Sequence, residues 1–132
     1  MQHNTKQHKA IASWAADCAE RVLPLFESAK PGDSRGKAAI SAARRWANGK
    51  ITMADARKAA IAGHAAARDA GSPAAREAAR AAAHAAATAH IPGHARNAAN
   101  AAVKAVAAAG GDDVAEESWQ DENVPMPDQA GG

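Results

Sequence analysis

The amino-acid sequence predicts an all-α protein: an alanine-rich antiparallel bundle of about five helices with a disordered acidic C-terminal tail. Alanine accounts for 42 of the 132 residues, and alanine is the best helix former but is depleted in strands. Only 20 apolar residues are not alanine, with three Trp, one Phe and no Tyr, so the core must form by close approach of helix backbones. Helix start and stop signals recur along the chain. The length allows one domain.

The first two helices are predicted over residues 5–28 and from Asp33 to Asn48. In the first, apolar side chains recur every 3.6 residues and form one stripe. Pro24 lies inside this stretch, and because proline lacks a backbone N–H we expect a kink or a restart there. Asp33 is a natural N-cap for the second helix, and Gly49 follows its end.

Three further helices are predicted after residue 51. Thr52 and Asp55 resemble a capping box at the start of the third helix. Ser72 and Pro73 supply a cap and a first-turn proline for the fourth helix. The fifth helix is predicted over residues 94–109. Short connections between the five helices indicate an antiparallel bundle.

Charge divides the chain into two parts. All 16 Lys and Arg lie before residue 112, whereas seven of the 14 acidic residues lie in residues 112–132. The formal charges are therefore +9 for residues 1–111 and −7 for residues 112–132. The second part also has two prolines and few apolar residues, a composition that buries too little surface to offset its ordering entropy. We expect a helical bundle domain over 1–111 and a disordered acidic tail over 112–132.

Several protein classes do not suit the sequence. It contains no apolar run of 18 residues, and its first ten residues lack the apolar stretch of a signal peptide. Cys18 is the single cysteine, so an internal disulfide is impossible. We therefore expect a cytoplasmic protein that does not enter a membrane.

One face of the fourth predicted helix carries polar side chains four residues apart on an otherwise alanine surface: Arg76, Arg80, His84 and Thr88. The wide alanine surface predicts that this helix is central in the bundle. The polar row is then either an ordinary stripe facing solvent or a buried row that needs partners, because an unpaired buried polar group costs about 1–3 kcal/mol.

Four of the six histidines lie between the third and fifth predicted helices: His64, His84, His90 and His94. His90 and His94 have HxxxH spacing, but Pro92 interrupts the helical turn that would bring them together. A metal site would need a further ligand such as Asp17 or Glu20. Structural or pH-sensitive histidines are favoured over a metal site. We expect a structural role for His84 and a binding role for the pair that flanks the break.

The first predicted helix carries an acidic patch formed by Asp17 and Glu20 beside Arg21. The patch is either a surface ion pair within the helix, contributing about 0.3 kcal/mol, or the acidic partner of the histidines across the bundle. No phosphate-binding glycine loop, CxxC, HExxH or GxSxG motif is present, and Cys18 lies in the apolar stripe, where a thiol is usually inert. The sequence therefore offers no candidate for nucleophilic catalysis.

Four sequence strings carry a family resemblance: WAADCAERVLPLFE at 14–27, PGDSR at 31–35, AARRWANGKI at 42–51 and TAHIPGHA at 88–95. Over about residues 8–108 the chain resembles the Imm-five-like family of immunity proteins, which is linked to bacterial polymorphic toxin systems. The resemblance implies a small helical intracellular protein that neutralises a toxin. It departs from the family pattern at Gly36, where a proline is common, and at Ala101, where a tyrosine is common.

The resemblance also implies a set of functional positions, which we take as candidate partner-binding or ligand-binding residues. They are Asp17, Glu20, Arg21, Asp33, Arg35, Trp46, His64, His84, His90 and His94.

Three functions are then open. The first is an antitoxin that binds its cognate toxin and occludes it, which requires no catalytic group and no cofactor. The second is a nucleic-acid-associating protein, because nine excess positive charges attract phosphates and the acidic tail would compete with them. The third is a metal-binding protein or an enzyme that uses the histidines and acids. The first is favoured.

Overall fold

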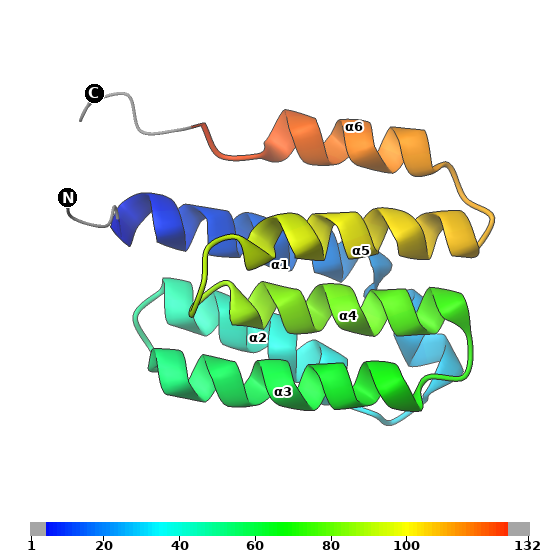
Figure 1. Cartoon of the computed structure of the whole chain (residues 1–132), viewed down its shortest axis with the longest axis horizontal. Helices are drawn as coiled ribbons and strands as arrows, with labels where there is room; N and C mark the ends of the chain where they lie inside the picture. Colours follow the sequence, from blue (N-terminus) through cyan, green and yellow to red (C-terminus); the bar gives the residue numbers. More distant parts are fainter. Residues whose placement is uncertain (1–4, 127–132) are drawn as a thin grey trace.

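The computed structural model describes residues 5–126, and within them the chain forms six α-helices and no strand (Figure 1). The all-α prediction is confirmed, and the predicted number of helices is corrected from five to six. The helices are α1 (Thr5–Ala29), α2 (Arg35–Ala47), α3 (Met53–Asp69), α4 (Pro73–Ala87), α5 (His94–Ala108) and α6 (Asp113–Asn123).

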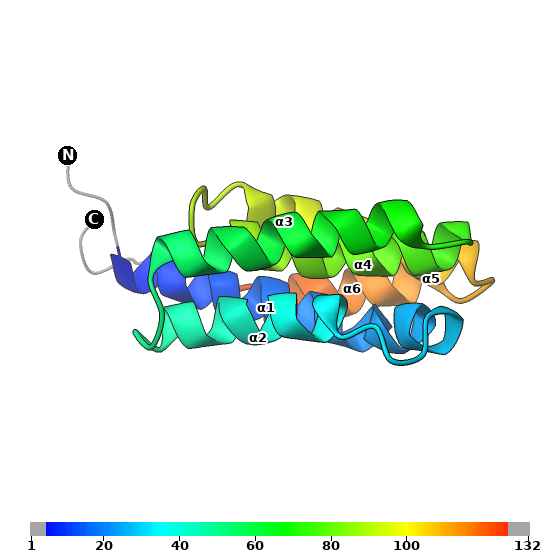
Figure 2. The same ribbon diagram turned by 90° about the horizontal axis from the view of Figure 1, so that it is seen from below.

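The helices form two layers, with each helix running opposite to the one before it (Figures 1 and 2). α3, α4 and α5 lie side by side in one layer, and α1 and α2 form the other. α6 lies along the edge of the bundle against α5. α4 contacts α1, α2, α3 and α5, which agrees with the central place that its alanine surface predicts. None of the described helices is long and apolar enough to span a membrane.

Close backbone approach replaces large side chains in most of the core. A Cβ atom on Gly63 would lie 3.0 Å from the Cβ and 3.1 Å from the Cα of Ala83, so glycine lets α3 and α4 approach more closely at this point than a larger residue would without a small shift. Phe26 and Trp14 are the large aromatic side chains buried in the core. Since the interior is filled mostly by methyl groups, helix positions are determined by backbone contact and leave polar side chains on the helix edges.

The local start signals act largely as expected. Thr52 and Asp55 form the predicted capping box of α3, and Ser72 accepts a hydrogen bond from the backbone N–H of Ala75 at the start of α4. Ser34 is the N-cap of α2, one residue after the predicted Asp33. α1 continues through Pro24 as one helix, so of the two expected outcomes, a kink or a restart, the restart is wrong.

The prediction of a disordered acidic tail is wrong for residues 113–123, which form α6. Asp112 caps the helix by accepting a hydrogen bond from the N–H of Ala115. Gln120 is 2% exposed and donates through Nε2 to the backbone oxygen of Ala99 at 2.9 Å. Its own backbone oxygen accepts a hydrogen bond from Trp14 Nε1 at 3.1 Å.

Composition missed α6 because its anchors are polar. Glu116 is 8% exposed and forms a bidentate ion pair with Arg21, at 2.7 Å from Nε and 3.0 Å from Nη2. The Arg21 guanidinium also lies 4.0 Å from the centre of the Trp119 ring. Directed hydrogen bonds of this kind order a helix that has few apolar residues. The last part of the predicted tail, residues 127–132, lies outside the described residues.

Candidate functional site

Three helices of one layer bring together His64, His84 and His94, which we call the histidine cluster. His64 comes from α3, His84 from the outer side of α4, and His94 is the first residue of α5. The His84 ring centre lies 4.8 Å from that of His64 and 5.1 Å from that of His94. The Nδ1 atoms of His84 and His94 are 3.0 Å apart. One of these two nitrogens must therefore carry a proton and donate it in a hydrogen bond, and the other must accept that hydrogen bond. The ring with the accepting Nδ1 is neutral.

The cluster disfavours the protonated form of its histidines. Burial, followed by the nearby charges of His64, His94 and Arg80, lowers the pKa of His84 from 6.5 to about 4. Burial is also the main cause that lowers the pKa of His64 and the pKa of His94. At neutral pH these rings are uncharged, and they act as hydrogen-bond donors and acceptors.

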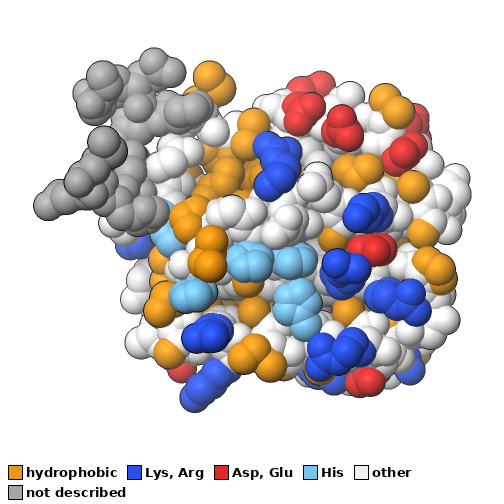
Figure 3. Space-filling view, viewed as in Figure 1, with side chains coloured by type: hydrophobic (Ala, Val, Ile, Leu, Met, Phe, Trp, Pro, Cys, Tyr) orange, Lys and Arg blue, Asp and Glu red, His pale blue; other side chains and the backbone are white. Residues whose placement is uncertain are grey.

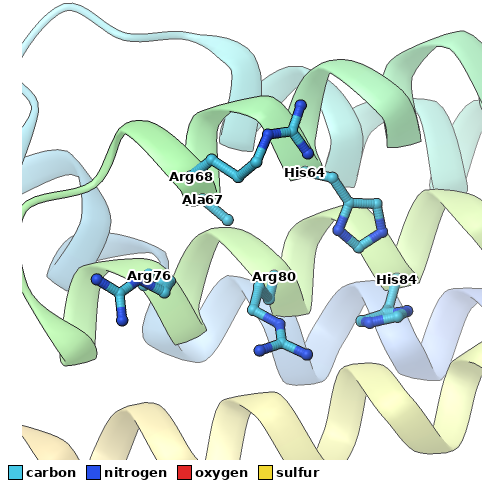
Figure 4. Close-up of a pocket in the computed structure, with 6 residues that line it drawn as sticks. All are labelled: His64, Ala67, Arg68, Arg76, Arg80 and His84. Carbon is cyan, nitrogen blue, oxygen red and sulfur yellow. The ribbon is translucent and has the colours of Figure 1, made fainter.

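A pocket of about 540 Å³ adjoins the histidine cluster between α3 and α4. We call it the α3–α4 pocket, and it is lined by His64, Ala67, Arg68, Arg76, Arg80 and His84. Figure 4 shows His64 projecting from α3 toward His84 of α4, while the Arg68 side chain extends along α3. The three guanidinium groups point in different directions, which keeps like charges apart (Figure 4).

The arginines of this pocket have few acidic side chains as ion-pair partners. None of the ion pairs within residues 5–126 involves Arg68 or Arg76. Arg80 has Glu77 at 3.7 Å, near the limit for an ion pair. The lining of the pocket contains no carboxylate. The α3–α4 pocket is therefore a region of positive potential that favours an anionic group.

A second pocket of about 240 Å³ continues from the first toward α5 and shares Arg80 and His84 with it. Its further lining includes Glu77, two asparagines and Lys104. The space-filling view in Figure 3 shows histidine side chains grouped beside Lys and Arg on this face, while acidic side chains gather over α6. The two pockets make one polar and mainly basic groove across α3, α4 and α5.

Comparison with known families identifies the chain. Residues 1–127 match the model of a family described as "Imm-5 like putative immunity protein". The chain belongs to this family. Neither a curated protein nor a solved structure matches it. In this immunity-family chain the match covers the bundle, α6 and the groove described above.

The acidic patch of this immunity-family chain does not face the histidines. Asp17 and Glu20 both accept hydrogen bonds from Nη2 of Arg44, at 2.8 and 2.6 Å. The expected pairing within α1 is also wrong, because Arg21 binds Glu116 instead. Both alternatives fail for the same reason: α2 and α6 each bring an oppositely charged side chain to α1.

Two more candidate residues act together at the start of α2. Asp33 accepts hydrogen bonds from the backbone N–H and from the side chain of Arg35. Arg35 also donates to Asp69 at the end of α3 at 2.9 Å. This hydrogen bonding holds the pKa of the Asp33 carboxyl below its usual range. The pair connects α2 to α3 and lies apart from the α3–α4 pocket.

Trp46 also contacts a residue outside the histidine cluster. Its ring centre lies 4.5 Å from that of His8, and the buried His8 donates a hydrogen bond from Nε2 to the backbone oxygen of Thr88. The Thr88 hydroxyl donates to the backbone oxygen of His84. The solvent exposure of the polar row therefore decreases along α4, from exposed Arg76 to fully buried Thr88 just after the helix.

His90 is exposed in the connection before α5, and its charge contributes to the lowered pKa of His94. Within the described residues, no group of three or more His, Cys, Asp or Glu side chains is placed to hold a metal ion. Cys18 is buried, and burial raises the pKa of its thiol to about 12. That thiol is uncharged and shielded, so it is a poor nucleophile.

Sequence reasoning missed Arg68 and placed Arg76 and Arg80 in the α4 row without assigning them to a site. One sequence signal could have found Arg68, since it follows His64 by one helical turn. The pocket itself depends on how α3 packs on α4, where Gly63 lies close to Ala83. No pattern within one helix reveals that packing.

Proposed function

We propose that this immunity-family chain neutralises a bacterial toxin in the cytoplasm by binding it and covering its functional surface with the groove face of α3, α4 and α5. The family match over residues 1–127 carries the proposal. The residues of this face support it, because arginines without acidic partners are available to bind an acidic surface of the toxin. Occlusion requires neither a cofactor nor catalysis by the chain.

The proposal changes which candidate residues are expected to contact the toxin. Asp17, Glu20, Arg21, Asp33 and Arg35 are engaged in ion pairs between or beside helices of the chain. These residues are expected to stabilise the packing of the helices. The histidine cluster, with exposed His90 at its border, and the pocket arginines are expected to form the toxin-binding face.

The test is co-expression with the toxin encoded beside the gene of this chain. Wild-type chain should restore growth and elute with a catalytically inactive toxin in size-exclusion chromatography. A double charge reversal, Arg68→Glu with Arg76→Glu, should abolish both effects because it places negative charge on the face. Arg45→Glu is the matched control, since Arg45 is exposed on α2 in the other layer.

Circular dichroism must first show that each variant keeps its helical content. Loss of protection with Arg45→Glu but not with the double variant would contradict the proposed face. Growth protection without any complex would contradict occlusion as the mechanism.

A further inference from the structure

We propose that the α3–α4 pocket binds a small phosphate-bearing ligand, up to about the size of a mononucleotide. The inference goes beyond toxin binding and does not depend on it. It is carried by an open surface pocket whose lining contains three arginines and two histidines, with no carboxylate among its residues.

The charge of the lining matches a phosphate group. Arginine presents several N–H donors in a planar arrangement that fits phosphate oxygens. Arg68 lies on α3, Arg76 and Arg80 lie on α4, and all three line the pocket. Their guanidinium groups point in different directions in Figure 4, so a ligand between the helices would draw these exposed side chains toward it from both helices. Its negative charge would also reduce the repulsion among the guanidinium groups.

The size of the pocket suits a small molecule. Its volume of about 540 Å³ falls in the usual range for small-molecule sites, about 300–1,000 Å³. Ala67 provides an apolar contact beside the cations. A mononucleotide has both features that such a pocket would recognise, a flat base and a charged phosphate.

A long nucleic acid fits this face less well. The exposed acids of α6 gather on the same side of the molecule as the groove (Figure 3). They are Asp113, Glu117, Asp121 and Glu122. An extended polyanion leaving the pocket toward α5 would approach these charges and be repelled. A ligand contained in the pocket would avoid them.

The histidines provide a second way to detect the ligand. A phosphate dianion beside His64 and His84 would favour their protonated forms and raise the pKa of each ring. The charged or titratable groups that face this cluster are His64 and Arg68 from α3, Arg76, Glu77 and Arg80 from α4, His94 and Lys104 from α5, and His90 from the preceding connection. Glu77 is the one acid in this set.

The experiment is calorimetric titration of the full chain, at low ionic strength, with AMP, inorganic phosphate, adenosine and single-stranded oligothymidylate. AMP should bind at one site per chain, inorganic phosphate should bind more weakly, and adenosine should not bind. The double variant Arg76→Gln with Arg80→Gln should weaken AMP binding about tenfold or more, because it removes two charge-assisted contacts. Arg45→Gln is the control and should leave AMP binding unchanged.

Nuclear magnetic resonance of the imidazole nitrogens gives an independent readout. AMP should shift the signals of His64 and His84 toward the protonated form and leave His8, which is buried elsewhere in the bundle, unchanged. Equal binding of adenosine and AMP, or equal weakening by Arg45→Gln, would overturn the proposal. Tighter binding of oligothymidylate than of AMP would also overturn it and would assign the face to nucleic acid.

Discussion

The arginines of this protein have two kinds of surroundings. Around α1, Arg21 binds Glu116 of α6, and Arg44 of α2 binds two carboxylates of α1. In the α3–α4 pocket, Arg68 and Arg76 have no ion-pair partner among residues 5–126. The same residue type therefore joins helices in one region and is left facing a cavity in the other.

The difference separates arginines that connect helices from arginines that do not. Alanine cores provide little burial per residue, so the edges of α1 gain support from directed polar contacts with α2 and α6. The pocket arginines contribute no such contact and leave like charges close together. In the two proposals above, a toxin or a phosphate-bearing ligand supplies the opposite charge.

The largest effect should come from the anchor of α6. Trp14 is 3% exposed and donates to the backbone of Gln120. Trp14→Ala should lower the free energy of unfolding by about 3–5 kcal/mol through lost burial and a cavity. Trp46, which is only partly buried, should cost less when replaced by Ala. Urea denaturation of both variants measures the difference, and equal losses would contradict the ranking.

A smaller loss is expected at the ion pair that fastens α6. Glu116→Gln keeps the shape of the side chain but removes its charge from the bidentate contact with Arg21. The free energy of unfolding should fall by about 1–2 kcal/mol. Glu117→Gln, on the exposed side of the same helix, is the control. If both substitutions have the same effect, α6 is not held by this pair.

Acid should destabilise the histidine cluster. Burial and nearby positive charge lower the pKa of His84 from 6.5 to about 4. Between pH 6.5 and pH 4, His84 therefore binds a proton more tightly in the unfolded chain than in the folded chain. The free energy of unfolding should therefore decrease as the pH falls from about 6.5 toward 4, and this contribution should level off below. His84→Gln should flatten that dependence in denaturation curves measured across the range. An unchanged slope would contradict it.

The smallest effects on folding should separate the two kinds of arginine. Arg44→Ala removes the ion pairs of Arg44 with Asp17 and Glu20 at the surface. It should lower the free energy of unfolding by less than about 1 kcal/mol. Arg76→Ala should change the free energy of unfolding by no more than about 0.5 kcal/mol, because no ion-pair partner within residues 5–126 is lost. Parallel thermal melts compare them. Greater destabilisation by Arg76→Ala would give that arginine a structural role.

The sequence by itself determined α1 to α5 and most of their ends. Alanine content specifies helix, and the capping pair of Thr52 and Asp55 and the Ser72–Pro73 start are local signals that act through hydrogen bonds within a few residues. The central place of α4 also follows from its alanine surface. The family follows from short strings of residues, and the match over residues 1–127 confirms it.

Tertiary structure alone decided which charges meet. Arg21 is 95 positions from Glu116, and Arg44 is 24 and 27 positions from its two acids, so no periodicity within a helix reveals either pairing. α6 was missed because its order depends on the burial of Glu116 and Gln120 against other helices. The pocket likewise exists only through the packing of α3 on α4, which leaves the arginines on one edge.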